Sequence, residues 1–232
     1  ERAQVMVSNI DFVGIVSSAD RPINVARIER FLVLAQHSQA EAVLILTKTD
    51  LGIPEDWKSI AEGFPKIGII ETSAVDGRGV NAIQELISPD HTLVLLGESG
   101  TGKSSLVNLL IGKEIQETSE VRVRDRKGRH TTVARELLII PTGGTLIDTP
   151  GIRGVGLWDA EEALDQVFIE ISAKAQLCRF KNCTHTAEPE CAVLSAVAVG
   201  QVDRMKLSRY LHLKDELLDQ AEKRNRQRRK SR

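Results

Sequence analysis

The strongest constraint on the fold is a glycine-rich loop in the middle of the chain. Its sequence, GESGTGKS, fits the pattern G-x-x-x-x-G-K-S, and it lies between an apolar run, Thr92–Leu96, and a helix-like segment, Lys103–Ile111. Glycines in such a loop let backbone amides turn inward around phosphates, and the helix N-terminus adds partial positive charge. A strand, this loop and a helix in that order predict a P-loop nucleotide-binding domain.

The phosphate loop is expected to make most of the contacts to the phosphates. Lys103 would reach the β- and γ-phosphates, and the Ser104 hydroxyl would bind magnesium. A glycine-rich turn that fits the pattern by chance is the alternative, and the flanking strand and helix argue against it. The residues predicted to bind nucleotide here are Gly97, Glu98, Ser99, Gly100, Thr101, Gly102, Lys103, Ser104 and Ser105.

A second phosphate-sensing segment is predicted where an apolar strand ends in Asp148-Thr149-Pro150-Gly151. Asp148 could hold magnesium through water, and the Gly151 amide could meet the γ-phosphate. Alone, these residues also suit an ordinary turn. Their position about fifty residues after the phosphate loop favours the functional interpretation.

A base-reading segment is predicted near the start of the chain. An apolar run, Ala42–Leu46, is followed by Thr47-Lys48-Thr49-Asp50, which looks like the Asn-Lys-x-Asp motif of GTP-binding proteins. Asp50 would accept hydrogen bonds from two guanine donors that adenine does not present in that arrangement. Lys48 would lie along the base and brace the phosphate loop, and Thr47 stands where Asn is usual. A plain loop is the alternative.

A second base-reading element follows the next apolar strand. Glu71-Thr72-Ser73-Ala74 is similar to the Ser-Ala loop that supports guanine, so the Ala74 amide would contact the guanine oxygen. Ser-Ala means little alone, but its order and its strand-end position favour this interpretation. The phosphate loop does not choose between ATP and GTP, whereas Asp50 argues for GTP.

The order of these motifs predicts a circular permutation. The base-reading elements (47–74) come first, then the phosphate loop (97–105), then two switch segments (118–153). A parallel sheet fixes where strand ends lie in space but not the order in which the chain visits them. Alternating strands and helices predict an α/β fold, a mostly parallel sheet with helices on both faces. The expected strands are Phe12–Val16, Ala42–Leu46, Ile67–Ile70, Thr92–Leu96, Glu136–Ile140 and Thr145–Ile147, the last two forming a hairpin, and the expected helices are Val25–Gln36, Asp56–Glu62, Val80–Ile87 and Lys103–Ile111.

A cysteine and histidine cluster interrupts the helix-like sequence that begins at Ala160. Three thiolates and one imidazole make a closed tetrahedral zinc set, which leaves no position for a catalytic water, so the zinc should be structural. Clustered buried cysteines without a metal are the alternative. An odd, clustered set of cysteines also favours a reducing compartment. The predicted zinc ligands are Cys178, Cys183, His185 and Cys191.

The C-terminal run Lys223–Arg232 is strongly basic, although the chain as a whole has a net charge of −1. Such a run is usually a solvated or frayed tail, and contact with nucleic acid is the competing interpretation. No apolar stretch approaches the length of a membrane span, so no membrane partner is expected.

The motifs together resemble the ribosome small-subunit-dependent GTPase A (RsgA) family. The resemblance runs from about Ser8 to Tyr210 and rests on the zinc cluster with EPECAV, on Ser208-Arg209-Tyr210 and on these segments: SNIDFVGIVSS, TKTD, ETSAVDGRGV, GESGTGKSSLVNLL and GRHTTVARELLIIPTGGTLIDTPGIRGVGLW. It implies GTP hydrolysis stimulated by the small ribosomal subunit, and a role late in that subunit's maturation. It also implies contact with ribosomal RNA, by a monomer in a bacterial cytoplasm. A plastid or a mitochondrion is the other possible compartment.

The resemblance also suggests the catalytic residues. Many GTPases orient the attacking water with a Gln after the Asp-x-x-Gly motif, but Ile152 stands there and cannot do so. The family pattern suggests His130 for this role, beside Lys103, and a solvated loop histidine is the alternative. Thr132 (or Thr131) would be a further magnesium-binding hydroxyl, together with Ser104 and Asp148. The segment Thr118–Thr132 is expected to be a mobile loop.

The domain expectation follows from the motifs and the resemblance. Family members usually carry an N-terminal OB-fold domain, for which this sequence has room only for Glu1–Val7. The expected divisions are a remnant or linker (1–8), the permuted GTPase domain (9–159), a small, mainly helical zinc-binding domain (160–222) and the basic tail (223–232). Two competing functions remain: a GTP/GDP-switched RNA- or ribosome-binding module in which hydrolysis is only a timer, and a P-loop ATPase.

Overall fold

The computed structural model describes residues 9–87, 89–112, 136–148 and 157–230. These residues form two compact units. The sheet unit contains residues 9–31 and 38–148, and the helical unit contains residues 32–37 and 157–230. Among the described helices, none combines the length and the apolar character that a membrane crossing requires.

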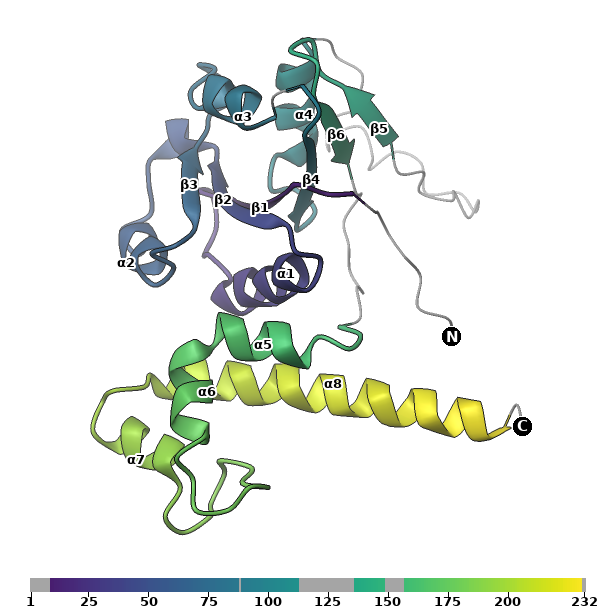
Figure 1. Cartoon of the computed structure of the whole chain (residues 1–232). Coiled ribbons are helices and arrows are strands. Elements are labelled where there is room, and N and C mark those ends of the chain that lie inside the picture. The colour runs from purple at the N-terminus through teal and green to yellow at the C-terminus, as the bar shows by residue number, and fades with distance from the viewer. Residues whose placement is uncertain (1–8, 88, 113–135, 149–156, 231–232) are drawn as a thin grey trace, which may run out of the picture. The chain divides into compact units, whose positions relative to one another are not determined.

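A six-stranded sheet forms the centre of the sheet unit (Figure 1). Its strand order is β3-β2-β1-β4-β6-β5, and every neighbouring pair is parallel except β5 and β6, which form an antiparallel pair. The strands are β1 (Phe12–Ser18), β2 (Glu41–Thr47), β3 (Gly68–Glu71), β4 (Thr92–Gly97), β5 (Glu136–Ile139) and β6 (Thr145–Asp148).

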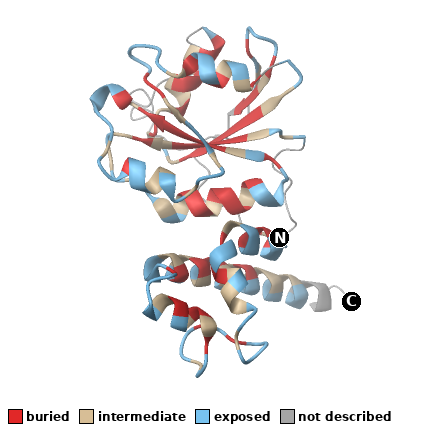
Figure 2. Cartoon of the chain, turned by 60° about the vertical axis from the view of Figure 1, so that its left-hand side comes forward, coloured by how far each residue is buried: buried red, intermediate tan, exposed pale blue. Residues whose placement is uncertain are grey.

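The central strands are continuous apolar runs because both faces of the sheet are covered. Helices α3 and α4 lie on one face, and α1 and α2 lie on the other, so buried residues follow the strands (Figures 1 and 2). Leu106 and Leu110 of α4 pack against Leu95 and Ile45 of the sheet in one buried cluster. The helical elements are α1 (Val25–His37), the 3-10 helix η1 (Thr49–Leu51), α2 (Trp57–Glu62), α3 (Val80–Leu86) and α4 (Lys103–Ile111).

The register of the sheet brings the carboxyl ends of three strands to one edge. Ser18 of β1 is paired with Thr47 of β2, and Val16 of β1 is paired with Gly97 of β4. The base-reading segment and the phosphate loop therefore begin at neighbouring positions, although Thr47 and Gly97 are 50 positions apart in the sequence. Open α/β sheets bind ligands at this edge.

The helical unit combines residues 32–37, the end of α1, with four further helices around a small apolar core. Phe168, Ile171, Val193 and Leu213 are buried together there. The helices are α5 (Glu161–Val167), α6 (Ile169–Ala175), α7 (Ala192–Ala198) and α8 (Arg204–Lys230).

The predicted α/β class with its mostly parallel sheet and hairpin is confirmed, and each predicted strand and helix of the sheet unit ends within two residues of its expected bounds. The expectation of a frayed tail is wrong for residues 223–230, which continue α8. Arg, Lys and Gln favour helix, and extending an existing helix needs no new nucleus. The predicted mobile loop, Thr118–Thr132, lies outside the described residues.

Candidate nucleotide site and candidate metal centre

The phosphate loop turns tightly between β4 and α4. A Cβ atom on Gly97 would lie 2.6 Å from the Val16 carbonyl oxygen of β1, so only glycine fits there. Gly100 and Gly102 both have φ +82°, a left-handed conformation that side chains disfavour. The glycines of the motif are therefore required by the backbone path itself.

Lys103 lies inside the curve of this loop. Its ammonium nitrogen donates to the carbonyl oxygens of Gly97 at 2.8 Å and Glu98 at 2.6 Å, and the side chain is buried. The first turn of α4 also holds Ser104 and Ser105, both partly buried. The loop thus combines a fixed positive charge, a helix N-terminus and hydroxyl groups, which suits a phosphate group and its magnesium ion.

Thr47 supports the phosphate loop from beneath. Its hydroxyl lies 2.6 Å from the Thr101 carbonyl oxygen and 3.1 Å from the Ser17 carbonyl oxygen. A hydroxyl has one proton, so the shorter contact to Thr101 is its main hydrogen bond. The side chain is buried. A short hydroxyl therefore ties the base-reading segment to the phosphate loop at the position where Asn is usual.

Lys48 makes a second tie between the same two segments. Its ammonium donates to the Gly100 carbonyl oxygen at 3.1 Å and pairs with Asp20 at 2.6 Å. The backbone of Lys48 is left-handed, with φ 59° and ψ 33°. This conformation is uncommon for a residue with a side chain, so surrounding contacts must hold it.

The two base-reading elements meet at Asp50 and Ser73. The Ser73 hydroxyl donates to Asp50 Oδ1 at 2.7 Å, and the Thr49 hydroxyl donates to the Thr72 carbonyl oxygen at 3.0 Å. Ser73 is buried, whereas Asp50 and Ala74 are exposed. Asp50 is thus oriented from behind while its carboxylate remains accessible to a base.

Of the predicted switch residues that would bind magnesium or act on the phosphates, only Asp148 lies among the described residues. Asp148 ends β6 and is paired with Leu95 of β4, so the carboxyl end of β6 lies beside the strand that leads into the phosphate loop. Gly151, His130 and Thr132 (with its alternative, Thr131) lie outside the described residues.

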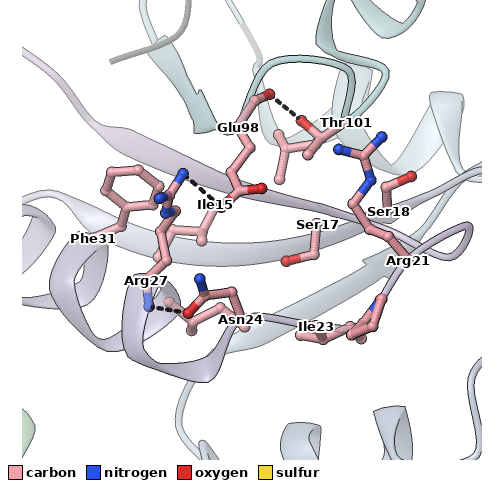
Figure 3. A pocket seen from close by; sticks show the side chains of 13 residues that line it. Ile15, Ser17, Ser18, Arg21, Ile23, Asn24, Arg27, Phe31, Glu98 and Thr101 are labelled. Carbon is pink, nitrogen blue, oxygen red and sulfur yellow. Dashed lines mark hydrogen bonds and ion pairs between the residues drawn. The ribbon is translucent and has the colours of Figure 1, made fainter. Parts of the chain in front are cut away.

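Three charged residues on this edge, Asp20, Arg21 and Arg27, were not predicted from the sequence to belong to the site. Asp20 and Arg21 follow β1, Arg27 lies in the first turn of α1, and its guanidinium pairs with Glu98 of the phosphate loop at 2.6 Å (Figure 3). Hydrogen bonds from Lys48 and Ser18 hold the pKa of Asp20 well below its usual range, against the opposing effect of desolvation. The available signal was a charged pair, Asp-Arg, directly after a buried strand.

The Cys/His cluster has the dimensions of a zinc site. The sulfurs of Cys178 and Cys191 are 3.8 Å apart, and they lie 3.6 Å and 3.5 Å from Nδ1 of His185. All four potential ligand atoms, including that of Cys183, lie within 4.8 Å of one another. Tetrahedral zinc with ordinary bond lengths separates two sulfurs by about 3.8 Å and sulfur from nitrogen by about 3.6 Å. The Cys3His set therefore fits zinc.

Local contacts orient these ligands. Cys191 precedes α7, and its sulfur accepts a hydrogen bond from the Leu194 backbone amide at 3.4 Å. Burial lowers the pKa of His185, and the charge of Lys214 lowers it further, so the imidazole is kept in the neutral form that binds metals. Burial raises the pKa of the Cys183 thiol to about 11. A bound cation would reverse that preference, because metals bind the thiolate.

The chain matches two family models. The first is described as RsgA GTPase and matches residues 1–158. The second is described as 50S ribosome-binding GTPase and matches residues 92–225.

Several curated relatives carry the name Small ribosomal subunit biogenesis GTPase RsgA. The Streptomyces avermitilis protein is 44% identical over 219 residues, which are 90% of this chain and 58% of that protein. The Methanosarcina acetivorans protein is 39% identical over 225 residues, 95% of this chain and 60% of that protein. The chain thus spans about three fifths of the length of these relatives.

Two solved structures support the same assignment. YjeQ from Thermotoga maritima is 31% identical with a TM-score of 0.65, covering 90% of this chain and 72% of that one. YloQ, described as a circularly permuted GTPase, is 28% identical with a TM-score of 0.62, covering 91% and 69%. The predicted circular permutation is confirmed, and the chain belongs to the RsgA GTPase family.

Proposed function

We propose that this chain is a GTP hydrolase that the small ribosomal subunit stimulates, acting late in that subunit's maturation. The observation that carries the proposal is the pair of ties from Thr47 and Lys48 to the phosphate loop. They join a segment suited to a base and a segment suited to phosphates into one site. The relatives' names supply the ribosomal part.

Guanine selectivity rests on the Asp50 carboxylate. The Ser73 hydroxyl donates one hydrogen bond to a single carboxylate oxygen of Asp50. The remaining lone pairs of the carboxylate can accept two guanine donors in a charge-assisted, bidentate contact. Adenine lacks this donor pair, so ATP should bind poorly.

Hydrolysis would depend on charge stabilisation around the phosphates. Lys103, and a magnesium ion held by Ser104, Asp148 and Thr132, would neutralise the charge that develops on the transferred phosphoryl group. His130 is our candidate for orienting the attacking water, since Ile152 has no polar group. We expect slow hydrolysis by the chain alone, with the switch segments ordered by the ribosome.

The zinc ion would act as a structural element. Cys178, Cys183, His185 and Cys191 would occupy all four positions and leave no open one for a catalytic water. Its function would be to hold the segment between α6 and α7 in shape.

Ribosomal RNA would be contacted through phosphates. Helix α8 carries a basic C-terminal part, in which Lys223 and Arg226 are exposed, although Arg224 is paired with Asp159. Such groups provide salt-dependent affinity with little sequence selectivity. This function would place a monomeric protein in the cytoplasm of a bacterium.

The deciding experiment measures GTP hydrolysis by the chain alone, with purified small subunits and with purified large subunits, using ATP as a control. Stimulation by small subunits, with GTP only, would support the proposal. Stimulation by large subunits instead would contradict the proposed partner. Hydrolysis of ATP at a similar rate would contradict the guanine assignment.

The role of His130 needs its own variant. His130→Ala should abolish stimulated turnover and leave GTP affinity unchanged, whereas His37→Ala, a substitution of an exposed histidine on α1, should change neither. Stimulated turnover that survives in His130→Ala would refute the assignment.

A further inference from the structure

The carboxylate of Asp20 binds two cations at the edge of the sheet. Its Oδ2 lies 2.6 Å from Lys48 Nζ, and its Oδ1 lies 3.1 Å from Arg21 Nε. The Ser18 hydroxyl, at the end of β1, donates to the same Oδ1 at 2.5 Å. Asp20 is therefore held in place by the strand that precedes it.

Both cations also reach one carbonyl oxygen of the phosphate loop. Lys48 Nζ lies 3.1 Å and Arg21 Nη2 lies 3.2 Å from the Gly100 oxygen, and Arg21 Nη1 lies 3.3 Å from the Ser99 oxygen. Asp20, Lys48, Gly100 and Arg21 thus form a closed ring of hydrogen bonds, which we call the Asp20 ring. Figure 3 shows Arg21 extending from the segment after β1 toward the loop at Thr101.

The segment after β1 carries a second brace. The Arg27 backbone amide donates a hydrogen bond to Oδ1 of Asn24 at 3.1 Å. Asn24 is thus an N-cap of α1 and fixes the start of the helix. Arg27 then pairs with Glu98 at 2.6 Å. One segment therefore contacts the phosphate loop at Glu98, Ser99 and Gly100.

We propose that Asp20 is a positioning residue of the nucleotide site. Asp20 holds the side chain of Lys48, whose aliphatic stem would lie along the guanine base. Together with Arg21 it also fixes the Gly100 turn of the phosphate loop. The inference rests on the proposed function, because it assumes that guanine nucleotides bind here.

Preorganisation is the physical basis of this role. A free lysine side chain has many rotamers, and ordering it during binding costs affinity. Lys48 already has a fixed direction, because its left-handed backbone and its two partners determine it. Without Asp20, the ammonium would keep only one of these partners, so each binding event would have to order it.

A double-mutant cycle tests whether Asp20 acts through Lys48. Affinity for GDP and the rate of GDP dissociation are measured with a fluorescent GDP analogue for the full chain, Asp20→Asn, Lys48→Met and the double variant. The Asp20–Lys48 pair is partly exposed, so Asp20→Asn should weaken GDP binding by about fivefold and speed its release. In the Lys48→Met background the same change should have a clearly smaller effect, because only the contact of Asp20 with Arg21 is then left to lose.

Two further variants control for general effects. Asp20→Glu, which keeps the charge, should recover part of the affinity. Glu222→Gln removes the carboxylate of an exposed ion pair with Arg226 on α8, and it should leave GDP affinity unchanged. Thermal unfolding of each variant shows whether the fold is retained.

The outcomes separate the inference from the function. If the wild-type chain binds GDP and Asp20→Asn binds it equally well, the inference is wrong. An Asp20→Asn loss that is equally large in the wild-type chain and in the Lys48→Met background also overturns it, since Asp20 would then act independently of Lys48. A wild-type chain that binds no guanine nucleotide would overturn the proposed function and the inference with it.

Discussion

Thr47 and Thr101 are 54 positions apart and share a hydrogen bond, whereas Cys178 and Cys191, the outermost residues of the Cys/His cluster, are only 13 positions apart. The first contact exists because parallel strands align their carboxyl ends, and backbone hydrogen bonds and a buried core hold that alignment. The cluster has no such frame, since residues 178–191 contain no helix or strand. One site is shaped by topology, whereas the other has a Cys3His set that fits zinc and that a bound ion would hold together.

Removing one predicted zinc ligand should have the largest effect, and it should affect only the Cys/His cluster. Cys183→Ser should eliminate bound zinc and unfold the cluster, because structural zinc contributes on the order of 10 kcal/mol in zinc-finger peptides. GDP affinity should be retained, since the sheet holds that site. Zinc content by atomic emission, limited proteolysis and GDP titration test these expectations.

Asn182→Ser is the matched control, because it introduces the same residue at an exposed neighbouring position. It should keep its zinc. Retention of zinc by Cys183→Ser would contradict the ligand set, and loss of GDP binding along with zinc would show that the two sites are not independent.

Exchanging the Asp50 carboxylate for an amide should change base selectivity without affecting the fold. Asp50→Asn loses two charge-assisted bonds to guanine, so GDP affinity should fall by about 10²- to 10⁴-fold. Xanthosine diphosphate carries a carbonyl where guanine has an amino group, so the new amide can donate to it and its affinity should rise. Competition binding with both nucleotides measures this, and Asp56→Asn, a substitution of an exposed acid six positions further along the chain, is the control. Unchanged selectivity would remove Asp50 from the site.

Replacing Lys103 should separate the phosphate contacts of the nucleotide site from its contacts with the base. Lys103→Met keeps the length of the side chain and removes the charge, so GDP affinity should fall by about 100-fold. Affinity for GMP should change much less, because GMP has no β-phosphate. Calorimetry with GDP and GMP distinguishes the two effects, with Lys66→Met as an exposed control. Equal losses for both nucleotides would point to a general disturbance of the loop.

Tyr210 should give the smallest effect, within the helical unit. Its buried hydroxyl donates to Asp165 at 3.1 Å, so Tyr210→Phe should destabilise the chain by about 1 kcal/mol. Burial raises the pKa of Tyr210, and the Asp165 carboxylate raises it further. Because the folded pKa exceeds the unfolded value, this stabilisation is complete below pH about 10 and is lost as the pH rises further.

Denaturant unfolding between about pH 8 and pH 11, a range that spans the ordinary tyrosine pKa, measures this loss as the difference between the wild-type chain and Tyr210→Phe. The chain has a single tyrosine, so its ultraviolet absorbance titration reports this group alone. An ordinary titration near pH 10 in the folded state would contradict the assignment.

Much of the sheet unit was predictable because its signals are local. Apolar runs such as those of β2 and β4 end in glycines or charged residues, and these boundaries lie within two residues of the observed ones. The Cys/His cluster was equally accessible, because its four members lie close together in sequence. The helical continuation of α8 contradicts the expectation of a frayed tail, because the basic residues that suggest fraying also propagate a helix well.

The sequence by itself determined the order of the motifs, and with it the circular permutation, since each motif is recognised from adjacent residues. Only the tertiary structure decided that the Thr47 hydroxyl supports Thr101, and that Asp20 and Arg21 join Lys48 around Gly100. The physical reason is the separation of these partners: Thr47 and Thr101 are 54 positions apart, Asp20 and Lys48 are 28 apart, and Arg21 and Gly100 are 79 apart, with no periodic or local pattern to link them. The strand register brings them together, and the register is a property of the whole sheet.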